Sequence, residues 1–261
     1  MPWSTTVELN LRQIALVAAR LAPIEAALVD VFDVRPCHRD PAVAAYGLEN
    51  VLLPFGRQFL EVVAPTRAGT AAERYLQRRG GDGGYMVITQ CDDHDARRRH
   101  VATLGVRIAH EFKAEGFRNM QLHPRDTGGS FLEIDQQLSA GDDWLPAGVA
   151  WRGHVSTTRI KAIAAAEIQA DDPTALAQRW AAIVQRPVRC EAGISSITLG
   201  NAELRFVPCT DGRPEGLAGL DIVTCDTAAV LAAAVRQGAR PHGASFVLGG
   251  MRWRLVSPPM A

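Results

Sequence analysis

The feature that most constrains this chain is a segment that occurs twice. Residues 128–134 read Gly-Gly-Ser-Phe-Leu-Glu-Ile, and residues 56–62 read Gly-Arg-Gln-Phe-Leu-Glu-Val. Each copy is a glycine turn followed by an alternating strand, on which the glutamate shares a face with the phenylalanine. A carboxylate in mid-strand is costly to bury without a partner, so Glu61 and Glu133 either face water or line a polar cavity. Internal similarity of this kind indicates a duplicated fold.

The order of predicted elements supports the duplication. A strand at 11–18 precedes a helix at 23–33 and strands near 48–55 and 59–63, and the loop between them has room for one more short strand. The same β-α-β-β-β order begins again near residues 85, 160 and 220. The sequence therefore predicts an α+β fold of four βαβββ modules arranged in two pairs.

A stretch without hydrophobic periodicity separates the two pairs. Residues 140–158 are rich in Gly, Asp and Pro, which is typical of a linker. Trp144 and Trp151 are expected to anchor it against a domain surface. We therefore predict a first domain at residues 1–139 and a second at residues 159–261.

Composition narrows the classes of partner. The chain has 28 Lys+Arg and 28 Asp+Glu, so its zero net charge provides no electrostatic reason to bind nucleic acid or an anionic membrane. It contains no apolar run of membrane-spanning length and no signal-peptide pattern at its start. Five scattered cysteines without a CxxC pair are typical of reduced thiols. We expect a cytoplasmic protein, monomeric or homodimeric, whose partner is a small molecule.

Two motifs and the four-module order resemble the vicinal oxygen chelate superfamily, which includes glyoxalases, bleomycin-resistance proteins, ring-cleavage dioxygenases and methylmalonyl-CoA epimerases. Leu-His-Pro-Arg-Asp-Thr-Gly-Gly at 122–129 is similar to the turn before the last metal-binding strand of those epimerases. Phe-Leu-Glu-Val-Val-Ala-Pro at 59–65 is similar to the end of their first module. The resemblance implies that paired modules form cupped, glyoxalase-like sheets around a small-molecule cavity.

The resemblance also implies a metal site with one ligand from the first and last strand of each paired module. These positions fall on Gln13, Glu61, Met86 and Glu133, with Tyr85 replacing Met86 if the register shifts by one. Carboxylates and an amide oxygen suit a hard divalent cation, whereas a thioether does not. Both a metal-bound site and a metal-free site therefore remain open.

Further residues are candidates at the same cavity. His123 could supply an imidazole to a metal held by the two glutamates, but its place in the turn motif favours a role in ordering that turn. Gln13 either binds substrate or a cation, or is a polar residue satisfied within its strand. Met86 is expected to line the substrate site, and Arg125 near the rim is a candidate to bind an anionic group.

The second half resembles the superfamily only through the order of its elements. Its last strands present Arg205 (or Leu204) and Arg254, and its first strands present residues near Ala164 and Leu220. Because an arginine repels a cation, this degenerate glyoxalase-like half is predicted either to close the fold or to bind an anion without metal.

Three functions follow from the resemblance. The first is a metal-assisted lyase or isomerase in which Glu61 and Glu133 are catalytic and the metal stabilises an enolate of a small carbonyl or acyl compound. The second is a metal-free relative that binds and sequesters a small molecule. The third, an extradiol dioxygenase, is disfavoured because the second half lacks two histidines and a carboxylate. Whether the chain is an enzyme depends on the choice between the first two.

Overall fold

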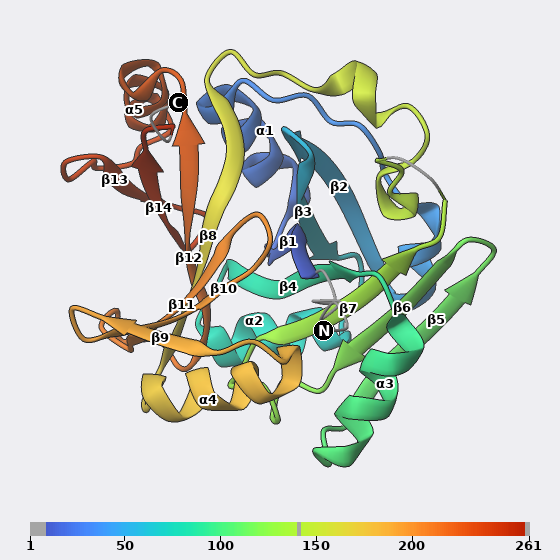
Figure 1. Ribbon diagram of the computed structural model, residues 1–261. Coiled ribbons are helices and arrows are strands. Elements are labelled where there is room, and N and C mark those ends of the chain that lie inside the picture. Colours follow the sequence, from blue (N-terminus) through green and yellow to red (C-terminus); the bar gives the residue numbers. More distant parts are fainter. Residues whose placement is uncertain (1–8, 140–141, 259–261) are drawn as a thin grey trace.

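The computed structural model describes residues 9–139 and 142–258 and shows two curled sheets side by side (Figure 1). Residues 1–8, 140–141 and 259–261 of the predicted domains and linker lie outside the described residues. Among the described helices, none combines the length and hydropathy needed to span a membrane.

The first sheet and its helices come from the first half of the chain. In order these elements are β1 (Leu9–Val17), α1 (Leu21–Phe32), a 3-10 helix (Pro41–Tyr46), β2 (Leu48–Phe55), β3 (Gln58–Pro65), α2 (Ala71–Arg79), β4 (Gly83–Cys91), α3 (His94–Thr103), β5 (Ile108–Ala114), β6 (Phe117–Leu122) and β7 (Phe131–Gln137). The strand order is β2-β3-β1-β4-β7-β6-β5, so the two glutamate-bearing strands, β3 and β7, flank the central pair β1 and β4.

The second half repeats this arrangement. After two 3-10 helices (Leu145–Ala147 and Trp151–His154) come β8 (Ile160–Ala170), α4 (Pro173–Val184), β9 (Val188–Glu191), β10 (Ile194–Thr198), β11 (Glu203–Pro208), β12 (Gly216–Thr224), α5 (Thr227–Arg236), β13 (Ser245–Leu248) and β14 (Met251–Val256). The strand order is β13-β14-β12-β8-β11-β10-β9, with β8 and β12 at the centre. The predicted α+β fold of two cupped, paired-module sheets is confirmed.

The outer modules differ from the predicted order by one strand. In the first module the 3-10 helix and a single bridge between His38 and Leu52 stand where a further strand was expected. Asp40 caps this helix through the backbone N–H of Ala42, and Pro41 follows at its first position. Proline has no N–H for a strand ladder, so this segment turns where a strand would pair. The fourth module likewise has only a bridge between His242 and Ser245 before β13.

One continuous core joins the helix-covered faces of the two sheets. Phe32 on α1 packs against Phe55 of the first sheet and Trp253 of the second, with ring centroids 5.2 and 4.8 Å apart. On the other side of the molecule, Trp180 on α4 donates a hydrogen bond to the backbone oxygen of Thr127 at 3.1 Å. The two halves therefore share their core, and the division into domains at residues 139 and 159 stays a prediction.

The glycines of the repeated segments lie where the second half approaches. Gly56 and Gly129 have φ values of +67° and +80°, a region that favours glycine. A Cβ atom would lie 2.0 Å from the backbone oxygen of Lys161 at Gly56, and 2.3 Å from that of Glu215 at Gly129. These motif glycines thus permit close contact between the halves.

Candidate functional site

The strand register places the four predicted ligand positions on one face of the first sheet. One row runs from Gln13 on β1 through Ile88 on β4 to Glu133 on β7. The next row, two residues along, contains Glu61 on β3 and Met86 on β4. Laterally paired residues share a face, so all four side chains point to the concave side, which we call the first cup.

A chain of hydrogen bonds holds Glu61. Gln13 Nε2 donates to Glu61 Oε2 at 2.9 Å, and Asn50 Nδ2 donates to Glu61 Oε1 at 2.7 Å. Trp144 Nε1 in turn donates to Gln13 Oε1 at 2.7 Å. Burial raises the pKa of Glu61, although the hydrogen bonds from Asn50 and Gln13 act in the opposite direction. Because the indole N–H occupies the amide oxygen of Gln13, the N–H₂ of that amide faces the carboxylate.

Glu133 lies deeper in the cup and is only 5 % exposed. Its Oε2 is buried and has no hydrogen-bond partner among the described residues. Burial raises the pKa of Glu133 to about 7, and repulsion from Glu61 contributes to the increase. The two glutamates therefore lie within electrostatic reach of each other in one cup.

A third carboxyl, which the sequence analysis did not single out, adjoins Glu133. Asp135 follows two residues later on the same face of β7, is fully buried, and accepts a hydrogen bond from Asn119 Nδ2 at 3.0 Å. Burial and repulsion from Glu133 raise the pKa of Asp135 well above its usual value. The i, i+2 spacing of the two acids was the signal that could have identified this third carboxyl.

The linker covers one end of the first cup. Trp144 and Trp151 are 1 % and 3 % exposed, and their rings pack edge-to-face on Phe117 and Phe59 with centroids 5.4 and 5.1 Å apart. We expected these tryptophans to anchor the linker on a domain surface, but they are buried inside the cup. The linker side chains remove the apolar residues at this end of the cup from water, and α2 does the same further along the face, where its Tyr75 and Leu76 pack in one cluster with Ala15.

The neighbouring row of the cup remains accessible. Glu61, Met86 and Phe131 are all partly exposed. At the two edges of the curled sheet, Tyr46 and His110 meet with ring centroids 5.7 Å apart and Oη 3.4 Å from Nε2. The first cup is therefore closed by aromatic rings at one end and opens beside Glu61.

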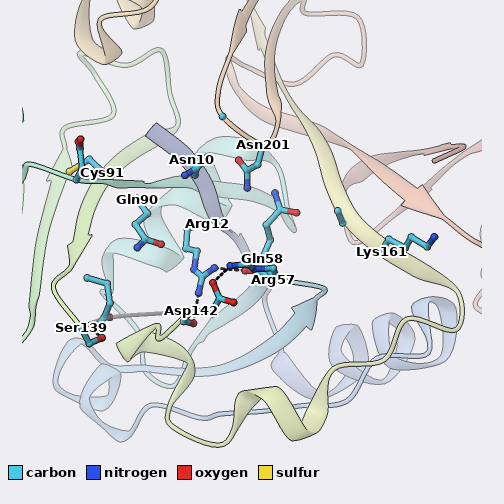
Figure 2. Close-up of a pocket in the computed structure, with 14 residues that line it drawn as sticks. Asn10, Arg12, Arg57, Gln58, Gln90, Cys91, Ser139, Asp142, Lys161 and Asn201 are labelled. Carbon is cyan, nitrogen blue, oxygen red and sulfur yellow. Dashed lines mark hydrogen bonds and ion pairs between the residues drawn. The ribbon is translucent and has the colours of Figure 1, made fainter. Parts of the chain in front are cut away.

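Arg12 ties the linker to the cup. Its guanidinium lies 5.3 Å from the ring centroid of Phe59 and 5.4 Å from that of Trp144, and burial lowers its pKa to about 10. It donates to the backbone oxygens of Arg57 at 2.6 Å and Asp142 at 2.8 Å. Figure 2 shows it beside Arg57 and Asp142 at a cavity of about 720 Å³ that also includes Lys161 of the second half. This arginine was not among the predicted site residues.

The other two predicted residues lie in the turn after β6. His123 Nδ1 accepts a hydrogen bond from the backbone N–H of Arg125 at 3.2 Å, and Arg125 is exposed. Burial and the nearby charge of Arg107 lower the pKa of His123. Within the part of the chain that the structure describes, no recorded contact joins His123 or Arg125 to Glu61 or Glu133. The structure thus brings together Gln13, Met86 and the two glutamates but leaves His123 and Arg125 in the turn.

The donor set of the first cup, as arranged, does not fit a divalent cation. Such an ion needs oxygen lone pairs directed at it, but Gln13 directs its N–H₂ at Glu61 and its oxygen at Trp144. Met86 contributes a thioether, a soft donor that does not suit a hard cation. Residues 9–139 and 142–258 contain no cluster of three or more His, Cys, Asp or Glu placed to hold a metal.

Comparisons with known proteins agree with this architecture. A family model described as a glyoxalase-like domain matches residues 37–184. A search of curated proteins found no match. Among solved structures, a mutant of 4-hydroxymandelate synthase from Streptomyces coelicolor is 14 % identical, with 92 % of this chain and 78 % of that chain covered and a TM-score of 0.69.

Two further structures are similar to this chain. The Mn(II)-bound glyoxalase from Novosphingobium aromaticivorans is 12 % identical, with 96 % of this chain and 83 % of that chain covered and a TM-score of 0.66. A methylmalonyl-CoA epimerase from Mycobacterium tuberculosis is 23 % identical, with 57 % of this chain and 97 % of that chain covered and a TM-score of 0.45. The glyoxalase and the 4-hydroxymandelate synthase both match more than nine-tenths of this chain, so the shared fold extends over both halves.

Proposed function

Because the chain belongs to the glyoxalase-like domain family of the vicinal oxygen chelate superfamily, as its motifs predicted, we propose that the first cup is the active site of a metal-independent enzyme. Its reaction would be proton transfer at the carbon next to a carbonyl in a small carbonyl or acyl compound. The observation that carries this proposal is the buried Glu133: its pKa is about 7, and a second carboxyl, that of Glu61, lies near it in the same cup. Perturbed carboxyls of this kind concentrate at functional sites.

Glu133 has the properties of a general base. A base is most effective when its pKa lies near the working pH, and burial together with Glu61 brings the pKa of Glu133 into that range. The unpartnered Oε2 of Glu133 would accept the proton from carbon. Asp135, beside Glu133 on the same strand face, would share that proton before it returns to the product.

The same cup offers donors for the oxygen of the substrate. Gln13 Nε2 and Trp144 Nε1 are buried N–H groups that now donate to Glu61 and to Gln13. In the proposed complex they would donate instead to the carbonyl oxygen, where negative charge develops as the proton leaves. Fixed donors aimed at such an oxygen stabilise an enolate.

The metal-assisted alternative requires a different arrangement of the cup. The similar glyoxalase from Novosphingobium aromaticivorans is Mn(II)-bound, which makes a metal plausible in this fold. Here, however, the hydrogen bonds from Trp144 and Gln13 would have to break before the Gln13 oxygen could face an ion. At about 1 kcal/mol each, that costs about 2 kcal/mol, and unlike in the proposed complex the two N–H donors would gain no acceptor on the substrate in exchange.

Binding without turnover is the second candidate. It is favoured by the aromatic enclosure that Phe59, Phe117, Trp144 and Trp151 form at one end of the cup. Aromatic side chains suit retention of a small apolar molecule, and such a protein would need no base.

Deuterium exchange tests the proposal. Pyruvate and hydroxyacetone, incubated with the protein in D₂O, are followed by ¹H NMR for loss of the protons next to the carbonyl. Glu133→Gln should slow the catalysed exchange about 10²- to 10⁴-fold, as expected for loss of a general base. Glu49→Gln, at an exposed glutamate on β2, is the matched control and should exchange like wild type.

Treatment with a chelator separates the alternatives. We expect EDTA to leave the exchange rate unchanged. Loss of exchange with EDTA and its recovery with Mn²⁺ would contradict the metal-independent mechanism. Saturable binding of a probe without exchange above the buffer rate would instead support sequestration.

A further inference from the structure

The concave side of the second sheet, here called the second cup, repeats the first with its charges reversed. One row runs from Ala165 on β8 through Asp221 on β12 to Arg254 on β14. It corresponds to the row that ends at Glu133 in the first sheet. Arg254 therefore occupies the position of Glu133, as the sequence predicted for this last strand.

The next row completes the correspondence. Arg205 on β11 pairs with Glu167 on β8, which pairs with Gly219 on β12. Arg205 therefore takes the position of Glu61, and Gly219 that of Met86. The first-strand positions are thus Ala165 and Gly219, each one residue from the predicted Ala164 and Leu220.

The arginines of the second cup are held by two acidic residues. Arg205 and Arg254 both donate to Asp221, whose side chain is 5 % exposed. Arg205 also pairs with Glu167 at 3.3 Å, and Arg252 pairs with the same carboxylate at 2.9 Å. This network fixes the guanidinium groups in place without any ligand.

The second cup keeps an excess of positive charge around an open space. Its cavity of about 330 Å³ lies within the usual size range of ligand sites. The charged side chains that line it are four arginines and two carboxylates: Arg205, Arg240, Arg252, Arg254, Glu167 and Asp221. Four positive charges against two negative ones leave a surplus of two. Asp211 does not line the cavity but pairs with Arg252, and counting its charge reduces the surplus of positive charge to one.

The rim of the cavity has a different character. Ile194 on β10 and Val247 on β13 line it, and they are 41 % and 59 % exposed. Arg254 uses Nε and Nη2 for Asp221, yet its side chain is 53 % exposed, so part of its guanidinium remains accessible. An accessible arginine fork suits a carboxylate, and the two aliphatic side chains suit an apolar body beside it.

We propose that the second cup is a separate binding site for a small organic anion, a carboxylate on a compact apolar body. The carboxylate would bond to Arg254 and Arg240, and the apolar body would contact Ile194 and Val247. A cation is repelled from this cup because arginines stand at both positions that carry glutamates in the first cup. The site is independent of proton transfer at Glu133, since it lies on the other sheet.

Benzoate is a suitable probe, with benzamide as its neutral counterpart of the same shape. Each is titrated into the full-length protein while ¹H–¹⁵N resonances are followed. Benzoate should shift resonances of β12, β13 and β14 in a saturable manner. Benzamide should bind at least about tenfold more weakly, because the arginines recognise the charge.

Two variants with matched controls locate the site. Arg254→Gln removes an accessible guanidinium while Arg205 still pairs with Asp221. Its control is Arg236→Gln, at a side chain that is 55 % exposed and paired with Asp30. Val247→Asp places a negative charge on the rim without touching an ion pair, and its control is Val235→Asp, at a residue 55 % exposed on α5.

Both cup variants should raise the dissociation constant for benzoate at least about tenfold, and both controls should stay within about twofold of wild type. If Arg254→Gln disturbs folding, the dissociation constant of Val247→Asp for benzoate decides whether the proposal holds. Absence of saturable shifts in the second sheet, equal binding of benzamide, or unaltered benzoate affinity in Val247→Asp would overturn the proposal.

Discussion

Replacing Glu133 with glutamine tests the environment of the first cup through stability alone and needs no substrate. Glutamine keeps the shape of the side chain but cannot ionise. Burial raises the pKa of Glu133 from 4.5 to about 7 in the folded protein, so the unfolded chain releases this proton at lower pH than the folded chain does. With about 1.4 kcal/mol for each pKa unit, the ionised glutamate costs the folded state about 3 kcal/mol.

The sign follows from the protons bound in each state. Below the pKa that Glu133 has in the unfolded chain, both states hold the proton, and Glu133 does not lower the stability of the folded state. Between pH 4.5 and about 7 only the folded state holds it, so the free energy of unfolding falls as pH rises. Above this window both states are ionised, and the cost stays constant. Between pH 5 and pH 8 the wild type should therefore lose roughly 2 to 3 kcal/mol that Glu133→Gln does not lose.

Urea unfolding followed by tryptophan fluorescence, at pH 5 and pH 8, measures this difference. Loss of the Glu133 charge also removes a repulsion that raises the pKa of Asp135. This further reduces the loss of stability between pH 5 and pH 8 in Glu133→Gln. Glu49→Gln is the control, because its side chain is exposed to water when folded. A stability difference between Glu133→Gln and wild type that is equal at the two pH values, within about 0.5 kcal/mol, would refute the burial of Glu133 among carboxyls.

Three further predictions concern the two cups. The rate of proton exchange in pyruvate should rise with pH through about 7, as Glu133 ionises, and a flat profile between pH 5.5 and 9 would count against its role as base. Trp144→Phe keeps the packing but removes the hydrogen bond to Gln13, so urea unfolding should show a loss of about 1 to 2 kcal/mol, and an unchanged midpoint would contradict that bond. Arg205→Met leaves the buried Asp221 with a single arginine and should destabilise the protein by about 3 kcal/mol, whereas the double variant with Asp221→Asn should recover part of that loss in the same assay.

Much of the fold could be predicted because its signals are local. Alternating strands, helix caps and glycine turns each depend on a few neighbouring residues: Asp93, Asp172 and Asp226, for example, cap α3, α4 and α5 through a backbone N–H three residues on. The short strand for which the loop after the first helix had room is absent, because Asp40 and Pro41 instead form a capped 3-10 turn.

For the candidate site, the positions of the two glutamates could be predicted from the sequence, but their ionisation could not. The duplicated segment alone indicated that Glu61 and Glu133 occupy equivalent strands, since repeated strands in paired modules must take equivalent places in the sheet. The ionisation of these carboxyls was not readable from the sequence. A pKa depends on burial and on nearby charges, and Glu61, which raises the pKa of Glu133, is distant from it in the chain and lies on another strand.

The sequence by itself thus determined the order of the elements, their fourfold repetition, and which side chains share a strand face, because these follow from spacing along a regular backbone. Only the tertiary structure decided that the linker closes the first cup, that Glu133 meets Asp135 away from water, and that Arg205 and Arg254 enclose Asp221 in the second. Each of these depends on which surfaces meet when the sheets curl, and that depends on packing across the whole molecule.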